Sequence, residues 1–461
     1  MRKFKEYDKY KNTDIAWLNK IPSHWTEFPN RYFFTELKNK VGKNSSKYTL
    51  LSLTKNGVII RDLSEMKGKF PAEFDSYKIV NEGNLILCLF DIEETPRTVG
   101  LSKNKGMITG AYNVLKIDNV NPKFITYFYI ALDNTKELRS LYRGLRKTIK
   151  IGKFLSVKTP YPPMDEQDKI VNFIEHKEKQ INKLIKKQKK LIELLEEKKK
   201  IIITEAVTKG LDKSVPMKDS GIDYIGYVPK HWEVGKIKKY YKMITGFTPD
   251  TTQIGYYDDI NGYKWMTISD LCGKYTPDST HRKISEKFIK LKHPKQTPKG
   301  SLLYSFKLSV GQVAFAKENI YTNEAIASFL EADKCNLKFL FYSSLLIVNN
   351  ANENIYSAKI LNQNLIKNAF IVFPPLQEQK VISDYLDKRC ELIEKIIDNK
   401  NSLIRKLEEY KKTLISFAVT GQIDVRDYEI PETDDNIDLE EIENISEDDT
   451  VIISEVEYAN N

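Results

Sequence analysis

The chain has 461 residues, 41% hydrophobic and 30% charged, a composition typical of a globular, helix-rich protein of two to four domains. No apolar run reaches the roughly 20 residues that span a bilayer, and the first residues, MRKFKEYDKYKN, do not form a signal peptide. The four cysteines are scattered without a CxxC pair, which argues against a disulfide or zinc framework and indicates buried thiols in a reducing cytoplasm.

Charge is distributed unevenly along the chain. Residues 427–461 contain 14 Asp or Glu and no Lys or Arg, which leaves 73 basic and 49 acidic residues in 1–426, a net charge of +24. A body this basic favours a polyanionic partner, although the excess of Lys over Arg also fits a protein from a lysine-rich proteome. The acidic tail is expected to be disordered and solvating, or to screen the body against non-specific DNA.

The first marker along the chain is WLNKIPSHW, which ends at Trp25, and a second copy, YIGYVPKHW, ends at Trp232, 207 residues later. We predict that both tryptophans are packing anchors at domain entrances rather than side chains that stack on bases. His24 and His231 have no Asp or Ser pattern around them, so the sequence indicates no catalytic role for either.

Residues 28–161 and 235–373 follow these markers and are rich in short β-type runs, turn residues and aromatic side chains. They share one pattern, in which EGNLILCLF at 82–90 and KGSLLYSFK at 299–307 each place a glycine turn before an apolar strand. Otherwise the two segments diverge. Each is predicted to be a globular α+β domain with a core of its own.

Basic and amide side chains in these two segments are candidates for contact with DNA, because Lys and Arg hold phosphates and amides read base edges. The strongest cluster is RSLYRGLRKTIKIGK, since arginines gathered in one segment fit a phosphate backbone. For each residue the alternative is a solvated surface charge. The candidates are Arg97, Lys103, Lys105, Arg139, Arg143, Arg146, Lys147 and Lys150 in the first segment and Arg282, Lys283, Lys307, Gln312, Asn323 and Gln363 in the second.

A second marker follows each globular segment. PPMDEQDKIV begins at Pro162 and PPLQEQKVIS at Pro374, an offset of 212 residues that also relates the AVT tripeptides at 206–208 and 418–420. The spacing between the two motifs is identical in both copies, so the segment between them has a fixed length. The whole chain is therefore an internal duplication with rigid and variable parts.

The fixed segments are predicted to be two helices of about 60 Å, because they lack Gly and Pro and their apolar residues recur at three and four. One stripe cannot be buried alone, so we expect an antiparallel coiled coil with a pseudo-two-fold axis, or faces of a helix bundle. Gln188 and Lys400 interrupt the stripes and are expected to meet as one polar layer. The predicted spacer and docking residues are Ile174, Ile181, Leu184, Gln188, Leu191, Leu195, Leu386, Ile393, Ile396, Lys400, Leu403 and Leu407.

Several catalytic and cofactor motifs are missing. The sequence contains no GxxxxGK[ST] for ATP and no strand-GxGxxG-helix for S-adenosylmethionine or a dinucleotide. YPPM and FPPL lack the acid or amide that grips a flipped adenine in adenine methyltransferases. No metal-dependent nuclease cluster is evident. The sequence thus favours recognition rather than chemistry, with no catalytic residues and no metal.

The order of these motifs, twice along the chain, resembles the specificity subunits of Type I restriction-modification systems. The resemblance covers residues 1 to about 426 and depends on KDSGIDYIGYVPKHWEV, on FPPLQEQKVISDYLD with its partner near Pro162, on the long helices and on ISFAVTGQID. The acidic tail is not part of that pattern. The resemblance implies two target recognition domains at 1–160 and 213–372, spacer helices at 161–212 and 373–426, and a tail at 427–461.

The resemblance further implies that each recognition domain reads one half of a split site in double-stranded DNA. Two modification (methyltransferase) subunits would dock on the helices and carry S-adenosylmethionine, and two restriction subunits would use ATP and Mg. Methylation and cleavage in phage defence would therefore come from cytoplasmic partners, without a membrane. Two alternatives remain: a related modification or phage-exclusion system outside Type I, and a coiled-coil adaptor that reads no sequence.

Overall fold

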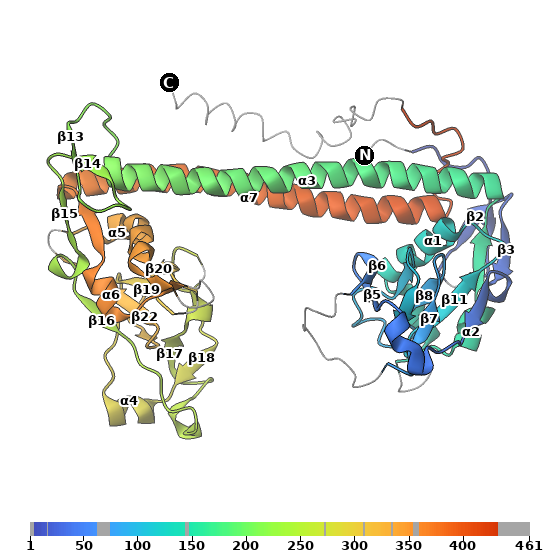
Figure 1. Cartoon of the computed structure of the whole chain (residues 1–461), viewed down its shortest axis with the longest axis horizontal. Coiled ribbons are helices and arrows are strands. Elements are labelled where there is room, and N and C mark those ends of the chain that lie inside the picture. Colours follow the sequence, from blue (N-terminus) through green and yellow to red (C-terminus); the bar gives the residue numbers. More distant parts are fainter. Residues whose placement is uncertain are drawn as a thin grey trace. The chain divides into compact units, whose positions relative to one another are not determined.

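The structure is a computed structural model that describes residues 4–15, 17–61, 74–142, 147–271, 273–307, 309–332, 335–353 and 359–431. The chain divides into two compact units: unit 1 has residues 1–190 and 399–461, and unit 2 has residues 191–398. Each unit contains a globular domain with strands and helices, together with parts of the long helices α3 (Met164–Lys209) and α7 (Leu376–Val419) (Figure 1). The predicted α+β class is confirmed.

The globular domain of unit 1 is built on an antiparallel four-stranded sheet in the order β4-β11-β8-β9. Two-stranded sheets surround it. The four strands are β4 (Phe34–Leu37), β8 (Leu85–Leu87), β9 (Val99–Leu101) and β11 (Asn113–Ile117). The pairs are β1 (Tyr10–Asn12) with β2 (Lys20–Pro22), β3 (Thr26–Pro29) with β12 (Lys158–Tyr161), β5 (Leu51–Thr54) with β6 (Gly57–Ile60), and β7 (Lys78–Val80) with β10 (Gly106–Ile108).

Unit 2 repeats this framework with the sheet order β16-β22-β19-β20, in which the strands follow one another along the chain as in unit 1. These strands are β16 (Met243–Thr245), β19 (Leu302–Ser305), β20 (Val313–Phe315) and β22 (Ile326–Phe329). The repeated pairs are β13 (Met217–Asp219) with β14 (Tyr227–Pro229) and β15 (Glu233–Lys236) with β25 (Phe370–Phe373). A second sheet joins β17 (Tyr263–Met266), β18 (Arg282–Ile284) and β21 (Tyr321–Thr322), and β23 (Asn352–Glu353) pairs with β24 (Lys359–Ile360).

A glycine turn enters the equivalent strand of both sheets, as the sequence predicts. Gly83 precedes β8 with φ +79°, and Gly300 precedes β19 with φ +83°. Glycine adopts this left-handed conformation without the strain that a Cβ atom brings. The residues of β8 and β19 are all buried, which explains why both runs are apolar.

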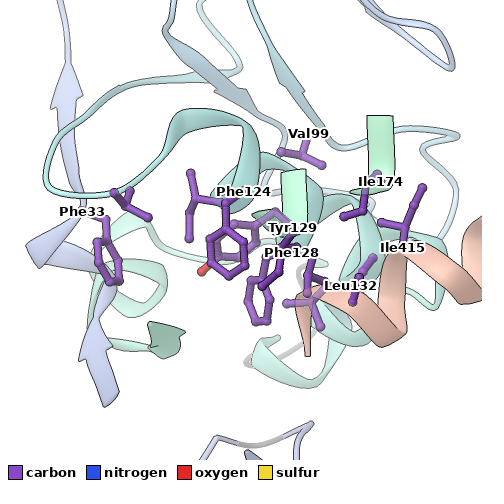
Figure 2. Close-up of a cluster of buried hydrophobic side chains, with 14 of the residues drawn as sticks. Phe33, Val99, Phe124, Phe128, Tyr129, Leu132, Ile174 and Ile415 are labelled. Carbon is purple, nitrogen blue, oxygen red and sulfur yellow. The ribbon is translucent and has the colours of Figure 1, made fainter. Parts of the chain in front are cut away.

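The core of unit 1 forms around α1 (Pro122–Asn134). Asn121 caps this helix, since its side chain accepts hydrogen bonds from two backbone amides of the first turn, and proline occupies the first helical position. Figure 2 shows Phe124 and Phe128 of α1 in one cluster of buried side chains that also contains Ile174 of α3 and Ile415 of α7. The long helices are therefore part of the core of this domain.

The remaining helices are short and follow the same duplication. α2 (Ile151–Ser156) precedes β12 in unit 1, and α6 (Gln363–Asn368) precedes β25 in unit 2. α5 (Leu337–Ser343) follows the last strand of its sheet as α1 does in unit 1. α4 (Glu286–Lys292) accompanies the second sheet of unit 2.

Within each unit the long helices run antiparallel. In unit 1, Ile170 and Ile174 share a core with Leu414, and the Lys411 Nζ atom donates to Asn182 Oδ1 over 3.0 Å, so positions rise along α3 as they fall along α7. In unit 2, Lys199 forms an ion pair with Glu394, and Ala206 shares a core with Leu386. Among the predicted stripe residues, Ile174, Ile181, Leu184, Leu386, Ile393, Ile396, Leu403 and Leu407 are buried and Leu195 is half-buried.

The prediction that Leu191 belongs to the buried stripe is wrong, because its side chain is 37% exposed. The inner positions of this stretch are Ile185, which is buried, and Gln188, Ile192 and Leu195, which are half-buried. Ile192 rather than Leu191 therefore follows Ile185 at a heptad interval. A heptad count that starts at Leu184, beside the seam, leads to Leu191 on the exposed face. The count that starts at Ile185 leads to Ile192.

The prediction that Gln188 and Lys400 form one polar layer is also wrong. Both lie in unit 1, where Lys400 is 7% exposed and the Gln188 Oε1 atom is buried. The Lys411–Asn182 hydrogen bond sets a register that brings Gln188 level with Arg405, five positions along α7 from Lys400. At 1.5 Å per residue the two polar side chains are offset by roughly 7 Å along the axis, so they occupy successive layers.

Two further expectations concern the membrane and the thiols. Over the residues that the structure describes, none of the helices combines the length and apolar character needed to cross a membrane. Cys88, Cys335 and Cys390 are free and buried, as expected, and burial raises the pKa of the Cys390 thiol to about 11. Cys272 lies outside the described residues.

Candidate nucleic-acid interface

The motif residues of the first copy meet at the start of α3. The Trp25 Nε1 atom donates to Glu166 Oε1 over 3.0 Å, and the Tyr7 hydroxyl donates to the same carboxylate over 2.5 Å. The His24 Nε2 atom lies 2.7 Å from Glu166 Oε2. Burial, together with the bond to this carboxylate, raises the pKa of Tyr7 far above its ordinary value, so the phenol remains a donor.

The second copy builds the same junction at the start of α7. The Trp232 Nε1 atom donates to Glu378 Oε2 over 2.8 Å, and His231 Nε2 lies 2.8 Å from the other carboxylate oxygen. Trp25 and Trp232 are fully or almost fully buried. The prediction that they are packing anchors is confirmed, and both histidines belong to structural hydrogen bonds.

The glutamine of each EQ motif ties its helix to the globular domain. The Gln167 side chain donates to the Pro162 carbonyl and accepts from the Asn121 backbone amide, both at 2.8 Å. Gln379 makes the equivalent two bonds, to the Pro374 carbonyl and from the Asn336 amide, again at 2.8 Å. Since the amide that each glutamine holds belongs to the N-cap residue of α1 or α5, the motif fixes the angle between helix and domain.

A glycine after each long helix lies against the tryptophan of the junction. Gly421 follows α7 with φ +71°, and a Cβ atom there would lie 2.4 Å from the Pro22 Cδ atom. Gly210 follows α3 with φ +77°, and a Cβ atom there would lie 3.1 Å from the Trp232 ring. Each junction therefore joins the start of one long helix to the end of the other within a single unit.

Some of the predicted DNA-contact residues of unit 1 are exposed, and others are paired with carboxylates of the same domain. Lys103 and Lys105 are exposed in the turn between β9 and β10, and Lys150 is exposed at the start of α2. Arg97 is only 18% exposed, and its guanidinium donates to Asp133 Oδ2 over 3.0 Å, neutralising a buried carboxylate. Arg97 is thus engaged inside the domain, and its contact with DNA stays a prediction.

The basic cluster at 139–150 is partly outside the described residues, because Arg143 and Arg146 fall there. Lys147 donates to Glu94 over 2.8 Å, a bond that holds the pKa of that carboxyl below its ordinary value. Arg139 lies 3.7 Å from Glu93. The acidic side chains beside this cluster lower the local positive charge, which the sequence pattern did not indicate.

The predicted residues of unit 2 include one that is held in place by an aromatic ring. The Arg282 guanidinium lies 3.9 Å from the centre of the Tyr257 ring, a cation–π contact that orients an exposed cation. Lys283 donates to the Ile260 carbonyl, and Lys307 lies 3.5 Å from Glu324. The three amides differ: Gln312 is exposed, Gln363 donates to Thr245 Oγ1, and Asn323 is half-buried and accepts from the Ala325 backbone amide.

An exposed histidine that no sequence pattern indicates directly precedes Arg282. His281 is 75% exposed, and its Nδ1 atom contacts Asp270 Oδ1 while the Asp270 side chain is 1% exposed. Asp270 also accepts from the Thr267 backbone and hydroxyl, so the carboxylate is fixed and orients the imidazole. The hydrogen bonds to Thr267 and His281 outweigh burial and hold the pKa of Asp270 below its ordinary value. No sequence signal links the two residues.

In the ranges that the structure describes, no group of three His, Cys, Asp or Glu side chains is placed to hold a metal ion. What the site offers instead is exposed cationic and amide side chains on two divergent domains. Such surfaces suit hydrogen bonding to phosphates and base edges rather than bond making or breaking.

The Lys103→Ala, Lys105→Ala double variant should weaken DNA binding and lower the slope of log K against log salt by about two, one for each lost phosphate contact. Fluorescence anisotropy with a target duplex at several salt concentrations measures this slope. Lys123→Ala is the matched control, because Lys123 is 53% exposed but forms an ion pair with Glu175 on α3. An unchanged slope in the double variant would clear both lysines of phosphate contact.

Comparison with known proteins identifies relatives along most of the chain. Residues 229–409 match the model of the Type I restriction modification DNA specificity domain. The Type I restriction enzyme MjaIX specificity subunit of Methanocaldococcus jannaschii is 29% identical over 42% of this chain and 46% of its own length. The alignment thus spans about half of that relative. The MjaX subunit of the same organism, a putative Type I specificity subunit by its name, is 22% identical over 92% of this chain and 98% of its own.

One solved structure has the same fold. That structure concerns complex assembly and conformational transition of the type I R-M system. Its TM-score against this chain is 0.64, at 14% sequence identity. The alignment covers 88% of this chain and 100% of that one. The likeness therefore extends over both units.

Proposed function

Because this chain belongs to the family of Type I restriction-modification specificity subunits, we propose that each of its two globular domains binds one half of a bipartite DNA sequence. Subunits of this family recognise DNA and are not catalytic. In this proposal the chain selects the site, and the partner subunits carry out the chemistry.

The observation that carries the proposal is a repeated framework with divergent outer residues. The Trp–Glu and Gln–backbone bonds of the junctions recur in both units with nearly equal lengths. The candidate contact residues do not recur, since unit 1 offers exposed lysines and unit 2 offers Arg282 on Tyr257 and an exposed Gln312. This pattern is expected of two domains that bind different DNA sequences but are attached to the long helices in the same way.

We infer that the long helices act as the spacer between the two half-sites. α3 has 46 residues and α7 has 44, and each contributes to both units. An uninterrupted helix transmits distance and rotation, whereas a flexible linker does not. Half-sites one duplex turn apart are separated by roughly 34–36 Å, a distance within the reach of such helices.

The partners in this proposal are two modification subunits that dock on the helices, with two restriction subunits beyond them. S-adenosylmethionine would be bound by the modification subunits, and ATP with Mg by the restriction subunits. The net charge of +24 in residues 1–426 would favour association with DNA in the cytoplasm.

Co-expression with the neighbouring modification gene in a host without DNA methylation tests the proposal. Long-read sequencing should find methylated adenines in a two-part motif with a fixed gap of unspecified bases. Exchange of one globular domain for that of a relative should change one half of the motif only. Methylation of a short continuous motif would instead favour a modification system of another type, and a stable complex without methylation would favour the adaptor.

A further inference from the structure

The chain covers one face of α3 in unit 1 with its own terminal segments. The Phe173 ring packs edge-to-face against Tyr428 at a centroid distance of 4.7 Å and against Phe4 at 5.9 Å. The Tyr428 hydroxyl lies 2.6 Å from His176 Nδ1, and the Lys177 ammonium lies 5.8 Å from the centre of the Tyr428 ring. Tyr428 is therefore held by an aromatic ring, a polar side chain and a cation that lie on one face of α3.

The segment that carries Tyr428 is fixed to the start of the chain. The Asp424 backbone amide donates to the Lys5 carbonyl over 2.7 Å, and the Arg426 guanidinium forms two hydrogen bonds with the Asp424 carboxylate. The same guanidinium lies 5.1 Å from the Tyr7 ring centre. Residues 424–429, with the sequence DVRDYE, contain a turn closed by a hydrogen bond from the Tyr428 backbone amide to the Val425 carbonyl over 3.1 Å, and Tyr428 has an acidic residue on each side.

In unit 2 the counterpart of this face is exposed among the residues that the structure describes. The offset of 212 residues maps Phe173, His176 and Lys177 onto Tyr385, Lys388 and Arg389. Tyr385 is 36% exposed, and Val381, one turn before it, is 50% exposed. Leu211, which the upstream offset of 207 residues maps from Phe4, is also exposed, at 38%. The duplication has therefore kept an aromatic ring and a cation one turn apart at these positions, but not the segment that packs on the ring in unit 1.

The positive charges on this face of unit 2 favour an acidic partner. The Arg389 guanidinium lies 6.0 Å from the Tyr385 ring centre, as a cation beside an aromatic platform. Among the described residues no carboxylate lies within ion-pair distance of Arg389 or Lys388. The nearby Asp384 and Asp387 are instead paired, with Lys338 and Lys274 respectively. Lys388 and Arg389, which border Tyr385, are therefore the cations that an acidic partner could pair with.

We propose that Val381, Tyr385, Lys388 and Arg389 form a docking site for a segment of the modification subunit that carries Tyr or Phe beside a carboxylate. The bound ring would pack edge-to-face on Tyr385, as Tyr428 packs on Phe173, and its acidic neighbour would pair with Lys388 or Arg389. The identity of the partner rests on the proposed function, whereas the chemistry of the segment follows from the occupied face of unit 1. One consequence is asymmetry, because the equivalent face of unit 1 is already filled by the chain itself.

Binding of purified modification subunit to the full chain tests the site, with biolayer interferometry as the measurement. Tyr385→Ala and Arg389→Glu should each weaken binding at least tenfold, since aromatic and arginine side chains dominate interface energies. Lys395→Glu is the matched control: it makes the same change of charge on α7 at a side chain that is 66% exposed. The melting temperature of each variant should equal that of the wild-type chain.

The outcomes separate the two proposals. If the wild-type chain fails to bind the modification subunit, the proposed function fails. If the wild type binds and methylates a bipartite motif but Tyr385→Ala binds equally well, only the docking site is wrong. Loss with Tyr385→Ala but not with Arg389→Glu would retain the aromatic contact and overturn the ionic one. A dimer of the chain alone that Tyr385→Ala abolishes, or tighter partner binding after removal of residues 432–461, would identify a different occupant and overturn the proposal.

Discussion

Duplication of one heptad in both long helices should lengthen the unspecified gap of the methylated motif by about three base pairs, while both half-sites stay the same. Seven residues add roughly 10 Å of helix, and successive base pairs are roughly 3.4 Å apart. Repeating residues 184–190 in α3 and 403–409 in α7 places the insertions opposite each other in the register of Lys411 with Asn182 and of Lys199 with Glu394. Each buried seam then continues without a shift.

Methylated-adenine mapping of the co-expressed complex measures the gap directly. An insertion in one helix alone is the control, because it displaces every buried residue on one side of the insertion by a heptad relative to the partner helix. That variant should lose methylation altogether. An unchanged gap in the double insertion would contradict the spacer role of the helices. Since three base pairs also rotate the duplex by roughly a third of a turn, we expect weaker methylation at the new site.

The duplication made the framework predictable from sequence. Two motifs at a constant separation required a rigid segment between them, and the structure has helices of 46 and 44 residues there. The glycine turns at Gly83 and Gly300 were visible because each precedes an apolar run in an otherwise divergent region. A local signal that occurs twice in the same order is strong evidence, since chance resemblance rarely preserves spacing.

The phase of the helix pair was harder to predict. Leu184, Ile185, Leu191 and Ile192 are adjacent pairs of apolar residues, so either member fits a heptad pattern. Only the structure distinguishes them, since Ile192 is half-buried and Leu191 is exposed. A second ambiguity is the axial stagger of two antiparallel helices, which the sequence does not give. The prediction that Gln188 and Lys400 share one layer depended on that stagger.

The DNA-contact surface could be predicted least. Arg97 and Lys147 appear as free cations in the sequence, but their carboxylate partners, Asp133 and Glu94, come from distant positions. The ring below Arg282 belongs to Tyr257, 25 residues earlier. Exposure and orientation of single side chains depend on such long-range packing, which periodicity does not encode.

Glu166→Ala should destabilise unit 1 by about 3–4 kcal/mol, whereas Glu378→Ala should destabilise unit 2 by about 1 kcal/mol. The two carboxylates have the same motif partners but different burial, since the Glu166 side chain is 3% exposed and that of Glu378 is 41% exposed. Removal of Glu166 leaves the Trp25 indole and the Tyr7 hydroxyl buried without an acceptor. Water can reach the position of the exposed Glu378 carboxylate and replace it as an acceptor for the Trp232 indole.

Amide hydrogen exchange resolves the two units within one chain, where a single melting temperature would average them. Peptides from β8, β11 and α1 should lose protection in Glu166→Ala, and peptides from β19 and β22 should change little in Glu378→Ala. Glu166→Gln is the conservative control, because its amide oxygen still accepts a hydrogen bond and should restore part of the loss. Equal losses in the two alanine variants would contradict the role of burial. The helix-to-domain junctions would then be held mainly by the Gln167 and Gln379 bonds, which are alike in both units.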